Sequence, residues 1–100
     1  MDLNGFTEKV RSITDKNTVI KDSTLKFVVD EGVVFVDTHT QPNTVSNEDK
    51  TADCAIHLSL SNASELLDGK MNVAMAFMMG KMKVKGDMGV AMKVAQLLSK

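Results

Sequence analysis

Residues 76–93, which read AFMMGKMKVKGDMGVAMK, contain five of the eight methionines of the chain. Within this stretch, residues 81–85 alternate lysine with an apolar residue, and a period of two is typical of a strand. Gly80 before this segment and Gly86 after it interrupt regular structure. The flanking segments carry apolar residues at helical spacing. The stretch therefore predicts a strand between two apolar helices, the first over residues 72–79 and the second capped by Asp87 and reaching about Leu98.

The final helix is predicted to be apolar on more than one side. One stripe consists of Met88, Ala91, Met92, Ala95 and Leu98, and a second consists of Val90, Val94 and Leu97. A sheet can cover one side of such a helix, so the other side must meet a partner chain, a membrane or a ligand. Methionine suits a ligand because its unbranched thioether adapts to irregular shapes. Periodicity and composition alone leave core packing and a ligand pocket as equal alternatives.

The segments upstream predict one helix followed by strands. Phe6, Val10 and Ile13 form one apolar face, which predicts an amphipathic helix over residues 3–14. Alternating patterns predict strands over residues 24–30, 33–38 and 52–60, of which the first two form a hairpin around Asp30-Glu31-Gly32.

Two further segments connect these elements. The polar residues 41–51 are predicted to form a loop. A short helix is predicted over residues 63–68, capped by Asn62 with Glu65 and ended by Gly69. Helices and strands in this order predict one α/β (α+β) domain over residues 1–100.

Composition and charge exclude several classes of protein. The formal net charge is −1, and the chain has four Phe but no Trp or Tyr, so neither a basic field nor stacking platforms for nucleic acid are expected. The sequence contains no run of about 18 apolar residues, which is the length that a membrane-spanning helix needs. The single cysteine, Cys54, excludes an internal disulfide and indicates a reducing compartment. The chain ends Leu98-Ser99-Lys100, one residue short of the peroxisomal Ser-Lys-Leu signal, so a cytoplasmic location is expected.

Two residue pairs are the candidates for catalysis or metal binding. Cys54 and His57 are separated by an odd number of positions, so in a strand their side chains point to opposite faces and cannot share a metal ion or form a nucleophilic pair. Asp37 and His39 share a strand face, but no nucleophile or phosphate-binding glycine loop accompanies them. We therefore predict no enzymatic activity, no metal and no cofactor.

The lysine row, defined as Lys81, Lys83 and Lys85, has two interpretations. It is a candidate for weak attraction of an anionic lipid head group. Solvated lysines that protect a strand edge from aggregation are the commoner explanation of such a row.

At residues 76–88 the sequence resembles sterol carrier protein type-2-like domains. The family pattern is an apolar stretch, Gly-Lys, a Lys/apolar strand, Gly-Asp-Met and a closing apolar helix. The segments 27–32, 52–53, 59–61 and 66–70 are also similar to the family, so the resemblance covers about residues 24–98. It implies a five-stranded, mostly antiparallel mixed sheet covered by helices, with an apolar tunnel between sheet and helices.

The resemblance also implies a function and a set of site residues. It implies non-enzymatic binding or transfer of a fatty acid, fatty acyl-CoA, sterol or phospholipid, with transient membrane contact. The residues expected to line the tunnel are Phe77, Met78, Met82, Val84, Met88, Met92 and Leu97.

One departure from the family keeps a different function open. The predicted N-terminal helix is shorter than is usual there, which leaves the domain less covered. A less covered domain is one that could pair with another chain. The alternative function, which rests on the second apolar side of the final helix, is an interaction module in which that exposed side pairs with a second copy of the chain in a homodimer.

Overall fold

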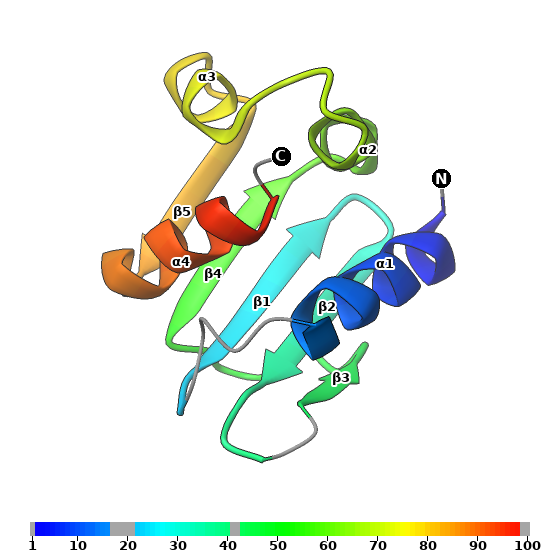
Figure 1. The fold of residues 1–100 in the computed structure, drawn as a ribbon, viewed down its shortest axis with the longest axis vertical. Helices are drawn as coiled ribbons and strands as arrows, with labels where there is room; N and C mark the ends of the chain where they lie inside the picture. The colour runs from blue at the N-terminus through cyan, green and yellow to red at the C-terminus, as the bar shows by residue number, and fades with distance from the viewer. Residues whose placement is uncertain (1, 17–21, 41–42, 99–100) are drawn as a thin grey trace.

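The computed structural model describes residues 2–16, 22–40 and 43–98, and the side chains of all of these except residues 15–16 and 97–98. The described residues form four helices and five strands (Figure 1). In chain order these are α1 (Leu3–Lys16), β1 (Thr24–Val29), β2 (Gly32–Asp37), β3 (Thr44–Ser46), β4 (Cys54–Leu58), α2 (Leu60–Leu67), α3 (Val73–Met78), β5 (Met82–Gly86) and α4 (Met88–Leu98).

The five strands form one mixed sheet in the order β3-β2-β1-β4-β5. β1 pairs antiparallel with β2 and parallel with β4, and the two outer pairs, β2 with β3 and β4 with β5, are antiparallel. The predicted mostly antiparallel mixed sheet of an α+β fold is therefore confirmed. The order places β5, the strand of the methionine-rich stretch, at one edge of the sheet.

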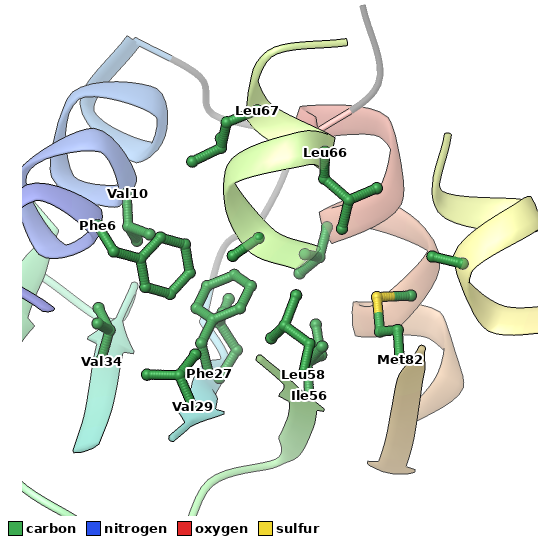
Figure 2. Packing of buried hydrophobic residues seen from close by; sticks show 14 of the residues in the cluster. Phe6, Val10, Phe27, Val29, Val34, Ile56, Leu58, Leu66, Leu67 and Met82 are labelled. Carbon is green, nitrogen blue, oxygen red and sulfur yellow. The ribbon is translucent and has the colours of Figure 1, made fainter. Parts of the chain in front are cut away.

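The core lies between one face of the sheet and the helices, as Figure 2 shows. Because side chains alternate along a strand, the helix-facing positions of β1 and β4 are buried, with the pattern repeating every second residue. Phe6 from α1 packs edge to face on Phe27 from β1, with ring centroids 5.4 Å apart. Leu66 from α2 and Met82 from β5 extend the same cluster toward the edge strand. The apolar face predicted for residues 3–14 is confirmed by the burial of Phe6 and Val10.

The predicted loop over residues 41–51 was wrong in part, because it contains the strand β3. Three residues are too few for an alternating pattern to be recognised in sequence. The strand exists because Val45 lies opposite Val36 in β2 and its carbonyl accepts a hydrogen bond from the Arg11 guanidinium, with Nη2 and O 3.3 Å apart. Asn47 then donates its side-chain amide to the carbonyl of Val33 at 2.9 Å. These partners lie far away in the sequence, so only the tertiary structure defines β3.

The junction between β4 and α2 also differs from the prediction. The strand ends at Leu58 rather than at residue 60, and α2 begins at Leu60 rather than at residue 63. Its N-cap is Ser59, whose hydroxyl accepts a hydrogen bond from the Asn62 backbone N–H at 3.0 Å. Asn62 therefore is not the cap, and its side chain donates instead to the carbonyl of Lys81 at 3.2 Å. The expected stop at Gly69 is present, with φ at 78°.

This cap gives a prediction for stability. Ser59→Ala removes the acceptor for one free N–H of α2, and we expect it to lower the free energy of unfolding by about 1 kcal/mol. Glu65→Ala, which tests the capping pair predicted from sequence, is expected to cost about 0.5 kcal/mol or less. Urea denaturation of both variants measures the difference, and a larger loss for Glu65→Ala would contradict the observed cap.

The two helices around β5 begin as the sequence predicts. The Asn72 side chain accepts from the Met75 N–H at 2.6 Å and caps α3. Asp87 Oδ1 accepts from the Gly89 N–H at 2.8 Å and from the Val90 N–H at 3.3 Å, and so caps α4. The methionine-rich stretch is therefore helix, edge strand and helix, arranged side by side.

Candidate functional site

A groove of about 300 Å³ lies between α3, β5 and α4. Each element contributes apolar side chains to the groove. In β5 these occupy every second position, and in the two helices they recur every three or four residues, so that they share one face of each element. The lining residues are Val73, Ala74, Phe77, Met78, Met82, Val84, Met88, Ala91, Met92 and Ala95. None of these side chains carries a charge or a hydrogen-bonding group other than the weak thioether.

The groove is open to solvent, and its rim is apolar. Met82 at its base is buried, whereas Met78 is 84% exposed and Met92 is 67% exposed. Large apolar side chains that converge on a hollow and remain exposed mark a surface that a ligand or partner covers. Burying such surface stabilises a complex by about 25 cal/mol for each Å² removed from water.

Six of the seven residues expected from sequence meet at this groove. They come from all three elements and comprise Phe77, Met78, Met82, Val84, Met88 and Met92. The side chain of the seventh, Leu97, lies outside the described residues.

Two residues of α3 line the groove but were not among the lining residues expected from the sequence. Val73 and Ala74 lie in its first turn, four residues before Phe77 and Met78. Residues four apart share a helical face, so this spacing was the signal that would have identified both.

The side chains of α4 are divided between the core and the groove. Val90 and Val94 are buried in the core, and Met88 and Met92 line the groove. Among the described side chains, Val90 and Val94 of one predicted stripe are covered by the chain itself. In the other stripe Met88 and Met92 are exposed along a hollow, whereas Ala91 is buried.

A second hollow lies beside the groove and shares four of its lining residues, including Met92. It adds the polar side chains of Asn72 and Gln96, so it provides amide groups next to an otherwise apolar surface. Hydrogen bonding is thus available at this end of the groove, whereas a charge is not.

The lysine row does not face the groove. In β5 the side chains of Met82 and Val84 point to the helix side of the sheet, so Lys83 and Lys85 point to the opposite side. Lys83 lies across from His57 of β4 on that opposite face. Lys81 precedes the strand, and its backbone N–H donates to the carbonyl of Ala76 at 2.9 Å. None of the three lines the groove.

The candidate pair Cys54 and His57 is separated as the sequence predicts. Cys54 is fully buried on the helix side of β4, and His57 is half-buried on the other side. Burial raises the pKa of the Cys54 thiol, and the nearby carboxylates of Asp87 and Asp53 raise it further. A buried thiol with a raised pKa is a weak nucleophile, so Cys54 acts as a small core residue.

Asp37 and His39 are in contact at the exposed end of β2. Oδ1 of Asp37 accepts from the His39 backbone N–H at 2.9 Å and lies 2.8 Å from Nδ1 of the same residue. These two hydrogen bonds, the backbone one foremost, hold the pKa of Asp37 below its usual value. A carboxylate that stays ionised at neutral pH is a poor general acid, and neither residue lines the groove.

Two features are absent from the described part of the chain. In residues 2–16, 22–40 and 43–98, no helix is long and apolar enough to cross a membrane. Over the same residues, no three His, Cys, Asp or Glu side chains gather in an arrangement that would hold a metal ion.

Curated relatives match about half of the chain. Sterol carrier protein 2 from Bos taurus is 49% identical over 51 residues, which are 51% of this chain and 9% of that protein. Hydroxysteroid dehydrogenase-like protein 2 from Xenopus tropicalis is 43% identical over 47 residues, which are 47% of this chain and 11% of that protein. The chain therefore corresponds to a small part of the length of these relatives.

Solved structures share the fold over nearly the whole chain. The palmitated SCP2L2 from Aedes aegypti superposes with a TM-score of 0.77 and 16% identity, covering 100% of this chain and 96% of that one. The sterol carrier protein domain 2 of Helicoverpa armigera gives a TM-score of 0.72 and 24% identity, with 93% and 85% covered. At these identities the similarity establishes the fold.

A match to a protein family extends over most of the chain. Residues 6–99 match the SCP-2 sterol transfer family, so the match includes most of α1, the whole sheet and all three sides of the groove. This agrees with the resemblance that the Gly-Lys and Gly-Asp pairs around β5 indicate in the sequence. The chain therefore belongs to the SCP-2 sterol transfer family, whose membership supports lipid binding and transfer as its general function.

Proposed function

We propose that the protein binds a lipid non-enzymatically by burying its apolar part in the groove between α3, β5 and α4. The observation that carries the proposal is the wholly apolar lining of a hollow whose rim methionines are exposed. The palmitated state named for the Aedes aegypti structure, which has the same fold, supports an acyl chain as one type of ligand. The groove volume lies at the small end of the range of about 300–1,000 Å³ usual for ligand pockets.

The energetics favour ligands with a long apolar portion. Each methylene moved from water into the groove contributes up to about 0.8 kcal/mol. The loss of translational and rotational freedom on association costs about 4–15 kcal/mol, which this burial must offset first. A fatty acid, fatty acyl-CoA, sterol or phospholipid has enough apolar surface to do so, and Phe77, Met78, Met82, Val84, Met88 and Met92 are the proposed contacts, with Leu97 as a further candidate.

The head group is proposed to lie at the Asn72 and Gln96 end of the groove. Those amides lie next to Met92, whereas Lys83 and Lys85 point away on the other side of the sheet. A head group would therefore gain hydrogen bonds rather than an ion pair, and affinity would follow chain length more than charge.

The homodimer alternative gains no support from the comparisons. A homodimer was expected because α4 is apolar on more than one side, but Val90 and Val94 are covered by the core of the same chain. The exposed methionines of α4 line the groove, where a lipid covers them equally well.

The direct test is extraction of the purified protein with organic solvent, followed by mass spectrometry of the extract. We expect a co-purified lipid, and we expect the stripped protein to take up a fluorescent fatty acid from solution. The mass in solution is measured alongside. An extract free of lipid, no uptake, and a stable dimer would together refute lipid binding and favour the interaction module.

A further inference from the structure

We propose that the methionine thioethers at the rim of the groove are a modification site for two-electron oxidants of the hydrogen peroxide class, and that their oxidation prevents the empty protein from taking up lipid. This inference rests on the proposed function, because the step that it controls is the loading of the groove. The side chains concerned, here called the rim methionines, are Met78, Met88 and Met92. All three are exposed and line the groove.

The seven methionines of residues 71–92 fall into three groups by their exposure to solvent. Met71 and Met82 are buried, with exposed fractions of 7% and 5%, and Figure 2 shows Met82 among the core side chains. The rim methionines are at least 53% exposed. Met75 and Met79 are exposed as well, but they do not line the groove. Because a thioether must meet an oxidant in solution, the exposed methionines are the reactive ones and the two buried ones are protected.

The oxidation consumes one peroxide molecule for each thioether. The sulfur lone pair attacks one peroxide oxygen, so an S–O bond forms while the O–O bond breaks. The departing hydroxide takes the proton from the transferred hydroxyl group and leaves as water, and the sulfur has then lost two electrons to the peroxide. Thiol-dependent methionine sulfoxide reductases reverse the change, because they remove the oxygen as water while two thiols become a disulfide.

A sulfoxide changes the surface that a lipid would cover. It replaces a soft apolar thioether with a polar group whose oxygen accepts hydrogen bonds. The side chains described around the groove offer this oxygen no donor, so a covered sulfoxide would be left without a partner. Each sulfoxide that a lipid covers is therefore expected to weaken binding about tenfold. Met92 is a partial exception, because the amides of Asn72 and Gln96 line the adjoining hollow and are able to donate to it.

Lipid and oxidant compete for the rim methionines. A lipid in the groove would cover these side chains and exclude the oxidant, whereas an empty groove leaves them exposed. Oxidation is therefore expected to act on the empty form and to block its loading, while the loaded form keeps its lipid.

The thiol of Cys54 does not compete with the methionines for the oxidant. Its side chain is fully buried, and burial raises the pKa of the thiol, which keeps it protonated at neutral pH. Peroxide reacts with the thiolate form of a cysteine. The response to dilute peroxide is therefore expected to come from the exposed methionines.

The first experiment maps oxidation in the wild-type protein with and without lipid. Lipid-stripped protein and protein loaded with palmitate are treated with dilute hydrogen peroxide, digested and analysed by mass spectrometry. In the stripped protein we expect the exposed methionines to be oxidised before Met71 and Met82. Palmitate is expected to protect the rim methionines, while Met75 and Met79 react as before. Oxidation of the rim methionines at the same rate with and without bound palmitate would overturn the proposal.

The second experiment measures the affinity for a fluorescent fatty acid before and after peroxide treatment, as a ratio within each protein. In the wild type we expect the affinity to fall about tenfold or more, and to return after incubation with methionine sulfoxide reductases. The triple variant Met78→Leu, Met88→Leu and Met92→Leu keeps the rim apolar, and its ratio is expected to stay near one. Met75→Leu with Met79→Leu is the matched control, and we expect it to lose affinity on treatment as the wild type does.

The outcomes separate this inference from the proposed function. Uptake that survives complete oxidation of the rim methionines would overturn the inference and leave the proposed function standing. A triple variant that loses affinity on treatment as much as the wild type would do the same. So would loss of the circular dichroism signal on oxidation, because unfolding would then explain the lost uptake. Untreated wild-type protein that takes up no fatty acid would refute the proposed function, and the inference with it.

Discussion

Met92→Glu is expected to abolish lipid uptake while leaving the secondary structure largely intact. Met92 lies in the middle of α4, is 67% exposed, and lines both the groove and the neighbouring hollow. A carboxylate at this position would have to lose its water when an acyl chain covers it. That penalty is several kcal/mol for an unpaired charge, and about 3 kcal/mol already corresponds to a more than hundredfold loss of affinity.

The measurement is titration with a fluorescent fatty acid, accompanied by circular dichroism to verify the fold. Met79→Glu is the matched control, because it makes the same substitution at an exposed methionine outside the groove. We expect that control to take up the fatty acid from solution like the wild type. Unchanged uptake by Met92→Glu would mean that Met92 does not contact the ligand, and the proposed site would have to be abandoned.

Gly86→Ala is expected to lower the free energy of unfolding more than a glycine-to-alanine change at any other glycine of the methionine-rich stretch. Gly86 has φ at 101°, and a Cβ atom there would lie 2.3 Å from the backbone oxygen of Asp53. That oxygen also accepts the hydrogen bond from the Asp87 N–H at 2.8 Å, so it cannot move away freely. Backbone strain of about 1–2 kcal/mol adds to about 1–3 kcal/mol for the clash.

Gly80→Ala separates the strain from the clash. Gly80 also has a positive φ, 73°, but a Cβ atom there meets nothing within 4 Å. We expect a loss of about 1 kcal/mol for Gly80→Ala and about 3 kcal/mol or more for Gly86→Ala, both measured by urea denaturation. Equal losses would show that β5 can shift away from β4 at Asp53, and the close approach would not be what requires a glycine there.

The two glycines explain why residues 76–93 are informative as a sequence. Gly80 ends α3 and Gly86 ends β5, each with a backbone conformation that other residues adopt at a cost. Between them, the alternation of lysine with Met82 and Val84 identifies an edge strand with one face toward the core. The two terminating glycines and the periodicity of the residues between and around them were therefore sufficient to predict helix, strand and helix in this part of the chain.

The sequence was less informative where a partner far along the chain defines the structure. β3 depends on pairing with β2, and the start of α2 depends on Ser59 rather than on Asn62, whose amide bonds to Lys81. Neither arrangement leaves a periodic pattern, because each involves very few residues and contacts at long range.

The amino-acid sequence by itself determined the faces of the longer strands, because these follow from alternation. The glycine pairs around β5 carried the resemblance to the family, and that resemblance in turn implied the mixed sheet. The resemblance singled out the four methionines that line the groove, whereas the tertiary structure alone placed Val73, Ala74, Ala91 and Ala95 beside them. Core and groove residues have the same apolar chemistry and the same periodicity, so Val94 and Met92 on one helix are distinguished only by what packs against each. The tertiary structure also decided that the lysine row faces away from the groove, since an edge strand presents its two sides to different surroundings.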